Sequence, residues 1–205
     1  MTDELRAARA AALWIDALEA VAGRAAHELR NALNGAAVNL EVVRSRSLKP
    51  GSTGEQVSAF AQSASGQLDQ AAASFEALVS LVRPPRAPAD VGRLLGEALA
   101  LLRATAPPGA GALDAPPPGQ WLTSANPSIV RLVLTRLVLD GVAAGRFRSA
   151  AERVGEGIQL RIQDVIPSPP TIAALDVATA SGITVQPLDG DGIVLTFPAS
   201  ETVGA

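Results

Sequence analysis

The single histidine of the chain, His27, is the residue best suited to chemistry in this sequence. A neutral imidazole nitrogen is a nucleophile near physiological pH, because the intrinsic pKa of histidine is about 6.5. In the stretch RAAHELRNALNG (24–35) the carboxylate of Glu28 follows directly and can orient the ring or accept its proton. Arg30 adds a cation that can attract phosphate. These residue types predict nucleophilic transfer of a group through His27.

A histidine with no role on a solvated helix surface is the alternative. Glu28, Arg30 and Asn31 are also common residues on exposed helix faces. The apolar pattern sets Ala25 and Leu29 on the inner face of a helix, so His27 between them is expected to face outward. Asn31 and Asn34 follow at i+4 and i+7 and share its face. Outward placement suits both a surface residue and a group that must meet another protein.

Two long helices are predicted to position this histidine, over residues 4–46 and 55–82. The first range holds no proline, and the run SLKPGSTGE (47–55) between them is typical of a turn. Apolar residues recur in both helices at the three-and-four spacing of a coiled-coil seam. The seam residues are Ile15, Leu18, Ala22, Ala25, Leu29, Ala32, Ala36 and Val43 in the first helix and Val57, Ala61, Ala64, Leu68, Ala71, Phe75, Leu78 and Val82 in the second. A hairpin cannot cover its own apolar stripe, so we expect a homodimer joined as a four-helix bundle.

The remaining chain is predicted to form an α/β domain. Helices are expected over 90–106 and 126–145, the latter with Asn126 as N-cap, and a short helix over 172–182. A short strand is expected at 120–123, after a loop over 106–119, and strand pairs at 146–154 with 157–165 and around DGDG (189–192). The fold class is therefore α plus α/β, with a helical-hairpin domain at 1–84 and a domain of helices over a mixed sheet at 89–205.

The stretch HELRNALNG resembles the H-box of histidine kinases, in which a phospho-accepting histidine is followed by an acidic residue, Leu, a basic residue, Asn or Thr, Pro and Leu. Residues 27–31 and Leu33 match in order, and Ala32 replaces the proline. The position in the first helix of a hairpin resembles the family's dimerisation and phosphotransfer domain. The resemblance implies that His27 accepts a phosphoryl group and that Asn31 can position water for dephosphorylating a partner's aspartyl phosphate.

The second domain follows the element order of the family's ATP-binding α/β sandwich but departs from its nucleotide motifs. Arg136 and Asp140 stand where two asparagines of the N-box are usual, and the pair suggests a structural salt bridge rather than a metal site. Asp164 aligns with the aspartate of the D-x-G-x-G box but is followed by VIPSPP, and no glycine occurs before Gly182. Glycine allows a positive φ and close approach to a ligand, which Val, Ile and Pro do not. We therefore expect a degenerate domain without ATP.

The resemblance thus implies a histidine phosphotransferase of a bacterial phosphorelay that passes phosphate between receiver-domain aspartates through His27. No cofactor is expected, since magnesium would sit at the acidic site of the receiver. The expected partners are a second copy, response-regulator receivers and a histidine kinase. A non-catalytic pseudokinase scaffold, a response-regulator phosphatase acting through Glu28 and Asn31, and, with least support, an active kinase are the alternatives.

Composition excludes several other classes. The net charge of −3, with 17 basic and 20 acidic residues, argues against nucleic-acid binding, which needs clustered basic charge. The chain has no cysteine and one histidine, so thiolate sites and metal sites of several imidazoles within one chain are excluded. No apolar stretch approaches the roughly 18 to 20 residues that span a bilayer, and the charged N-terminus is unlike a signal peptide. We expect a cytoplasmic protein with no membrane partner.

Overall fold

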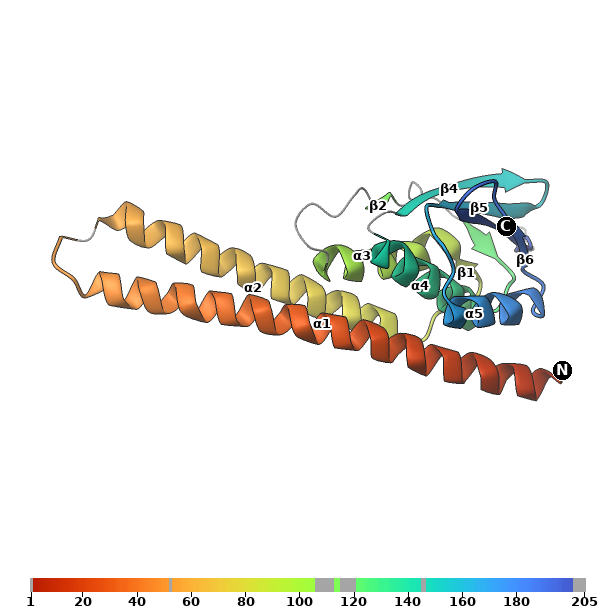
Figure 1. The fold of residues 1–205 in the computed structure, drawn as a ribbon, viewed down its shortest axis with the longest axis horizontal. Coiled ribbons are helices and arrows are strands. Elements are labelled where there is room, and N and C mark those ends of the chain that lie inside the picture. Colours follow the sequence, from red (N-terminus) through yellow and green to blue (C-terminus); the bar gives the residue numbers. More distant parts are fainter. Residues whose placement is uncertain (1, 52, 106–112, 115–120, 145–146, 201–205) are drawn as a thin grey trace, which may run out of the picture.

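A long helical hairpin and a more compact α/β part make up the structure (Figure 1). This computed structural model describes residues 2–51, 53–105, 113–114, 121–144 and 147–200. The hairpin consists of α1 (Asp3–Ser47) and α2 (Gly54–Val82), which confirms the two helices predicted from the sequence. The Oγ1 atom of Thr2 accepts a hydrogen bond from the amide of Leu5, and this N-cap begins α1.

Small residues line the interior of the hairpin. Ala32 and Ala36 of α1 and Ala64 and Ala71 of α2 are buried, and small side chains of this kind let two helix backbones approach closely. Several other seam residues stay exposed within the single chain, and their burial by a second copy stays a prediction. Ile15 is 57% exposed and Phe75 is 58% exposed, because alanines rather than the large apolar residues face the opposite helix.

A polar cluster sets the register of α1 against α2. The side-chain amide of Asn39 donates hydrogen bonds to Ser63 Oγ at 3.2 Å and to Gln67 Oε1 at 3.0 Å. The side chain of Gln67 lies over Gly35, where a Cβ atom would come within 2.3 Å of Gln67 Nε2. Gly35 therefore provides the space that the Gln67 amide occupies.

The α/β part contains a mixed five-stranded sheet with the strand order β2-β4-β5-β7-β6. The β2–β4 pair is parallel and the other pairs are antiparallel, so the expected mixed sheet and both predicted hairpins are confirmed. A separate two-stranded sheet pairs β1 with β3. Two residues of the predicted loop at 106–119 form β2, and Gln120 lies outside the described residues. The strands are β1 (Ala89–Asp90), β2 (Leu113–Asp114), β3 (Leu122–Thr123), β4 (Phe147–Val154), β5 (Gly157–Gln163), β6 (Thr184–Pro187) and β7 (Gly192–Phe197).

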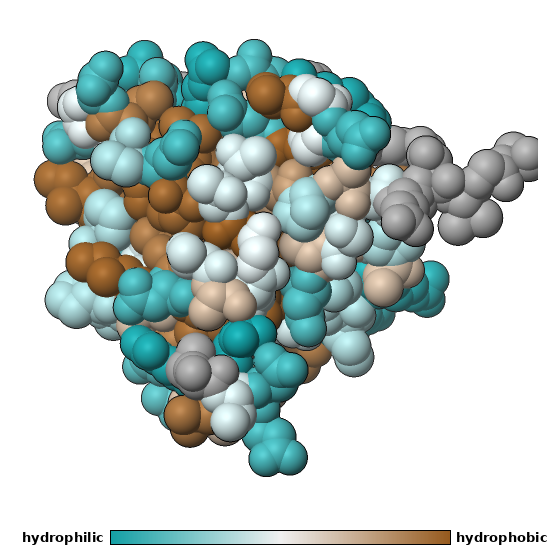
Figure 2. Space-filling view, turned by 90° about the vertical axis from the view of Figure 1, so that its right-hand side faces the viewer, coloured by the Kyte–Doolittle hydropathy of each residue, from teal (hydrophilic) through white to brown (hydrophobic). Residues whose placement is uncertain are grey.

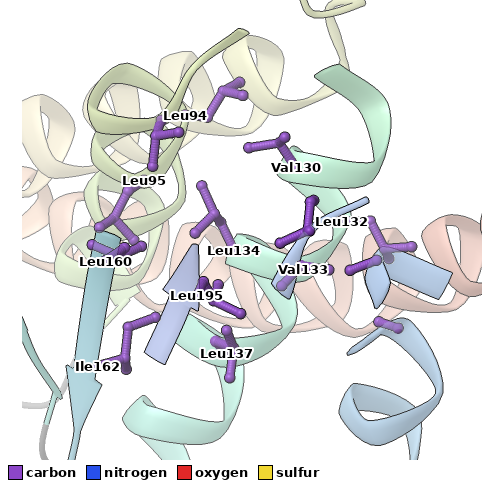
Figure 3. Packing of buried hydrophobic residues seen from close by; sticks show 14 of the residues in the cluster. Leu94, Leu95, Val130, Leu132, Val133, Leu134, Leu137, Leu160, Ile162 and Leu195 are labelled. Carbon is purple, nitrogen blue, oxygen red and sulfur yellow. The ribbon is translucent and has the colours of Figure 1, made fainter. Parts of the chain in front are cut away.

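Three helices pack in a common core with the large sheet: α3 (Val91–Thr105), α4 (Pro127–Ala143) and α5 (Pro169–Thr179). Figure 3 shows Leu134 and Leu137 of α4 close to Leu160, Ile162 and Leu195 of the strands. Apolar and polar residues alternate along β5, so its apolar side chains point into this core. As predicted, Asn126 caps α4 by accepting a hydrogen bond from the amide of Ser128.

The N-terminal part of α1 runs alongside α5 and joins the core of the α/β part (Figure 1). Ala17 is fully buried in that core, and Leu13 and Trp14 pack against it. The guanidinium of Arg136 donates to the carbonyl oxygen of Leu13 at 3.0 Å and forms a salt bridge with Asp16. The salt bridge predicted between Arg136 and Asp140 is wrong, because Arg136 reaches α1 instead. The division into domains at 1–84 and 89–205 stays a prediction, since the core includes residues from both ranges.

Among the described residues, no helix combines the length and the apolar character needed to cross a membrane.

Candidate functional site around His27

His27 lies near the middle of α1, on a regular helical segment that continues for several turns in both directions. Its side chain is exposed, whereas Ala25 is fully buried against α2, which confirms that His27 faces outward. Within the described part of the chain, no hydrogen bond or ion pair engages the imidazole ring. A ring held on a rigid helix and free of partners is accessible to a reacting group on another protein.

The residues one, two and three turns after His27 extend its exposed face along α1. Asn31 and Asn34 are exposed at i+4 and i+7, as predicted, and Val38, 64% exposed, continues the line at i+11. We call His27, Asn31, Asn34 and Val38 the His27 face. Arg30 is exposed beside it. An exposed valine at the end of a polar stripe gives this face an apolar contact point of its own.

Glu28 is half-buried and follows His27 directly in the chain. Adjacent residues on a helix point about 100° apart and do not face each other. The structure accordingly contains no hydrogen bond between the Glu28 carboxylate and the His27 ring among the described contacts. The role of Glu28 as orienting group or base therefore stays a prediction, as do the phosphate contact of Arg30 and the water-positioning role of Asn31.

The α/β part approaches α1 close to the level of His27. Leu101 of α3 and, at its edge, Leu139 of α4 pack in one cluster with Val21, Ala25 and Leu81 of the hairpin. Ala25 is only two residues from His27, so the ends of α3 and α4 lie within a few turns of the histidine. His27 points about 200° away from Ala25, so the His27 face is level with the ends of α3 and α4 along α1 but does not face them.

Asp140 and Asp164, the two carboxylates that align with nucleotide-binding positions of the resembling family, both form contacts with other residues of this chain. Asp140 Oδ2 accepts a hydrogen bond at 2.8 Å from the backbone amide of Ser168, the N-cap residue of α5. Asp164 Oδ2 lies 2.8 Å from both Nε and Nη2 of Arg148. Asp164 also has a φ of 62°, in the left-handed region that aspartate tolerates better than most residues. These contacts give both carboxylates structural roles.

The segment after Asp164 differs from its prediction in one respect. Helix α5 begins at Pro169, three residues before the predicted start at 172, because Pro169 and Pro170 occupy the first helical positions, where a missing amide donor costs nothing. Gly182 ends the segment with a φ of 87°, as expected for a helix C-terminus. The turn around DGDG is confirmed, with a φ of 90° at Gly190.

No group of three or more His, Asp or Glu side chains suited to holding a metal ion occurs in the described ranges. A buried cation is present instead: Arg131 stacks over the ring of Trp14 at 4.3 Å and donates to the carbonyl oxygens of Leu81, at 2.8 Å, and Arg83. Burial lowers the pKa of the Arg131 guanidinium, and the nearby carboxylate of Glu97 partly offsets this shift. Sequence reasoning missed Arg131, since it stands in an apolar run where only tertiary contacts reveal its surroundings.

An exposed apolar strip on the hairpin was also missed as a separate feature. Its residues are exposed and, within each helix, share one face through spacings of seven residues or, between Ile15 and Leu33, of 18 residues, which make five helical turns. We call it the outer apolar strip: Ile15, Leu33 and Leu40 of α1 and Leu68, Phe75 and Val82 of α2. Val82 is exposed while Leu81 beside it is buried towards the α/β part, so the strip faces away from that part. The seven-residue spacing was visible in the sequence but could not separate an intramolecular seam from an outer surface.

Comparisons with known proteins give two likenesses of fold. No family model and no curated protein matches the chain. Among solved structures, a bacterial phosphotransferase determined at 1.7 Å is similar over 87% of this chain and 94% of its own, with 16% identity and a TM-score of 0.38. The histidine kinase AdeS of Acinetobacter baumannii is similar over 86% of this chain and 98% of its own, with 14% identity and a TM-score of 0.45. Values this low identify no family.

Proposed function

We propose that this protein is a histidine-containing phosphotransferase that moves a phosphoryl group between receiver-domain aspartates through His27. The observation that carries the proposal is the state of His27 itself. Its ring is exposed, has no partner among the described residues, and lies on a long, regular helix within an H-box-like sequence. Exposure alone would also suit a surface histidine without a role, and the H-box-like sequence around the ring favours phosphotransfer over that alternative.

The proposed chemistry needs only the imidazole and the receiver. The unprotonated ring nitrogen attacks the phosphorus of the receiver's aspartyl phosphate, so a P–N bond forms as the P–O bond to the aspartyl carboxylate breaks. The positive charge on the ring is relieved when the other ring nitrogen loses its proton to water or to Glu28. The reverse sequence delivers the phosphoryl group to a second receiver. Magnesium at the receiver's acidic site would supply charge neutralisation of the phosphoryl oxygens in both directions.

The contacts of Asp140 and Asp164 support a transfer that does not start from ATP. A magnesium ligand at position 140 would have to give up the amide of Ser168, and an adenine contact at 164 would have to give up Arg148. Both changes would disturb the start of α5 and the pairing of β4 with the segment after β5. The phosphoryl group is therefore proposed to come from another protein.

The α/β part is proposed to serve as a docking surface for that protein. It is held against α1 by Arg136 and Asp16, and its α3 and α4 pack beside Ala25, two residues from His27. His27 and Ala25 point about 200° apart, so a receiver at the His27 face must reach around α1 to contact the α/β part. We place this exchange in the cytoplasm, with response-regulator receivers and a histidine kinase as partners.

A homodimer is proposed to form through the outer apolar strip. Leu68, Phe75 and Val82 recur at intervals of seven residues, the repeat by which a helix presents one face to a supercoiled partner. The small residues between α1 and α2 leave these large side chains on the outside. Pairing with a second copy would bury them in a four-helix bundle and leave the His27 face open.

Incubation with a panel of phosphorylated receiver domains tests the proposal, using wild type and the His27→Ala variant. Phosphate on the wild type but not on the variant supports transfer, whereas no transfer with any receiver favours a non-catalytic scaffold and contradicts it. Loss of receiver phosphate that persists in His27→Ala but needs Asn31 would indicate a phosphatase. Labelling by ATP alone would indicate a kinase and refute the nucleotide-free transfer.

A further inference from the structure

A cavity of about 690 Å³ lies between the N-terminal turns of α1 and the N-terminal end of α4. Its wall includes Arg6, Ala10 and Trp14 from α1 and Asn126, Ser128 and Arg131 from around α4. Trp14 precedes His27 by 13 residues, or roughly 20 Å along the helix at about 1.5 Å per residue. The cavity is therefore separate from the His27 face, and neither Asp140 nor Asp164 lines it. Figure 2 shows the end of the molecule at which α1 begins, where hydrophobic residues gather left of the centre of the view with hydrophilic residues around them.

Two arginines line this cavity with donors that lack a partner. Arg131 is only 6% exposed, and its Nε atom is buried without a hydrogen bond to any described residue. Its Nη1 atom donates to two backbone carbonyl oxygens, and no carboxylate lies within ion-pair distance of it among the described residues. The Nε atom of Arg6 is also buried without a partner, although its Nη1 pairs with Asp3 at 3.0 Å. The carboxylate of Glu97 favours the charge of Arg131 from a distance but pairs with Arg93, so the burial of Arg131 stays costly and a directly bound anion would relieve that cost.

The rest of the lining adds donors but few acceptors. The first amides of α4 are already satisfied, since Ser128 donates to Asn126 Oδ1 and Ile129 donates to the Asn126 carbonyl oxygen. What remains is the side-chain amide of Asn126, the Ser128 hydroxyl and the positive end of the α4 dipole. Asp3 is the one carboxylate in the lining, so Arg6 and Arg131 leave one net positive charge. Ala7 and Ala10 of α1 and Ile129 of α4 add apolar surface to the lining.

We propose that this cavity binds a small organic oxyanion, with its anionic group between Arg131 and Arg6 and its apolar body against Ala7, Ala10 and Ile129. The single net charge fits a carboxylate better than a dianionic phosphate ester, which would leave negative charge uncompensated. The ligand bridges α1 and α4, so its binding strengthens the attachment of the α/β part to the hairpin. The site does not depend on phosphotransfer by His27.

Titration with benzoate, phenyl phosphate and neutral benzamide at constant ionic strength tests this site. Binding is followed by the ¹⁵N–¹H signals of the arginine Nε groups and by the fluorescence of Trp14. We expect benzoate to shift the signals of Arg6 and Arg131, phenyl phosphate to bind more weakly, and benzamide not to bind. Because charge-assisted hydrogen bonds are the strong ones, Arg6→Gln should weaken benzoate binding by about tenfold and Ser128→Ala by a few-fold.

Arg44→Gln is the matched control, because Arg44 is also a residue of α1 paired with an acid three positions away and lies far from the cavity. It should leave benzoate binding unchanged. Equal binding of benzamide and benzoate, or no shift at Arg6 and Arg131 with either anion, would overturn the proposal. The proposal would also be overturned if both Arg6→Gln and Ser128→Ala bound benzoate as tightly as the wild type. Tighter binding of phenyl phosphate than of benzoate would contradict the single net positive charge of the site.

Discussion

Replacement of Gly35 by alanine tests the register of the hairpin, because the side chain of Gln67 occupies the space that a Cβ atom needs. The new methyl group would lie 2.3 Å from Gln67 Nε2 and 2.8 Å from Gln67 Cδ. Gln67 must therefore rotate away and give up its hydrogen bond with Asn39, while Asn39 keeps its bond with Ser63. Gly23 is the matched control, as it lies in the same helix and a Cβ there would meet nothing within 4 Å.

The magnitudes follow from two opposing terms. A glycine-to-alanine change inside a helix stabilises by about 1 kcal/mol through helix propensity. Loss of the Gln67–Asn39 hydrogen bond costs about 1 kcal/mol. Gly35→Ala should therefore change the free energy of unfolding by about zero, whereas Gly23→Ala should raise it by about 1 kcal/mol. In a Gln67→Ala background the clash is gone, so Gly35→Ala should then stabilise by about 1 kcal/mol.

Urea denaturation followed by circular dichroism, at one fixed protein concentration, gives these free energies. The account predicts a coupling of about 1 kcal/mol between positions 35 and 67 and none between 23 and 67. If Gly35→Ala stabilised the protein equally in both backgrounds, Gln67 would not lie over Gly35, and the register of α1 against α2 would be wrong.

Three further changes probe other parts of the molecule. Phe75→Glu places a charge in the middle of the outer apolar strip and should convert a dimer into a monomer, as measured by light scattering after gel filtration. Glu76→Gln, at the neighbouring position, should leave the dimer intact. A dimer that persists in Phe75→Glu would rule out this strip as the interface. Asp16→Asn removes the charge facing Arg136 and should lower the free energy of unfolding by about 1 kcal/mol in urea, a modest loss because Asp16 is 60% exposed; no loss would show that the salt bridge does not hold the α/β part. Asp140→Ala removes the acceptor for the Ser168 amide and should lower the free energy of unfolding by about 1 to 3 kcal/mol, with no change in ATP binding measured by calorimetry. If the wild type bound ATP and Asp140→Ala did not, Asp140 would have more than a structural role.

The sequence predicted the elements of this fold better than their mutual contacts. The proline-free helical pattern at 4–46, the turn at 47–55 and the DGDG turn are local signals, and α1, α2 and the β6–β7 hairpin follow them. The partner of Arg136 is a different matter. Asp140 is its i+4 neighbour in the sequence, but Arg136 pairs with Asp16, 120 residues away, because the N-terminal part of α1 packs on α4.

The candidate site was predictable to a similar extent. The exposure of His27, Asn31 and Asn34 follows from helical periodicity alone, since Ala25 fixes the inner face of α1. The residues that face the opposite helix were harder to predict, because alanine and leucine count equally as apolar residues in a periodic pattern. Only the packed hairpin shows that Ala32 and Ala36 face α2 while Ile15 and Leu33 remain outside. The cavity beside Arg131 depends on three separate segments and has no local signal.

Direct identification of the phosphorylated atom tests the central claim most closely. A receiver domain that transfers phosphate to this protein would be mixed with it, and ³¹P nuclear magnetic resonance would be recorded together with tandem mass spectrometry of the 24–35 segment. The account predicts an acid-labile phosphoramidate on His27 that disappears on addition of a second, unphosphorylated receiver, and no such signal in the His27→Gln variant. An acid-stable phosphate on a serine or threonine, or phosphate retained in the His27→Gln variant, would contradict it.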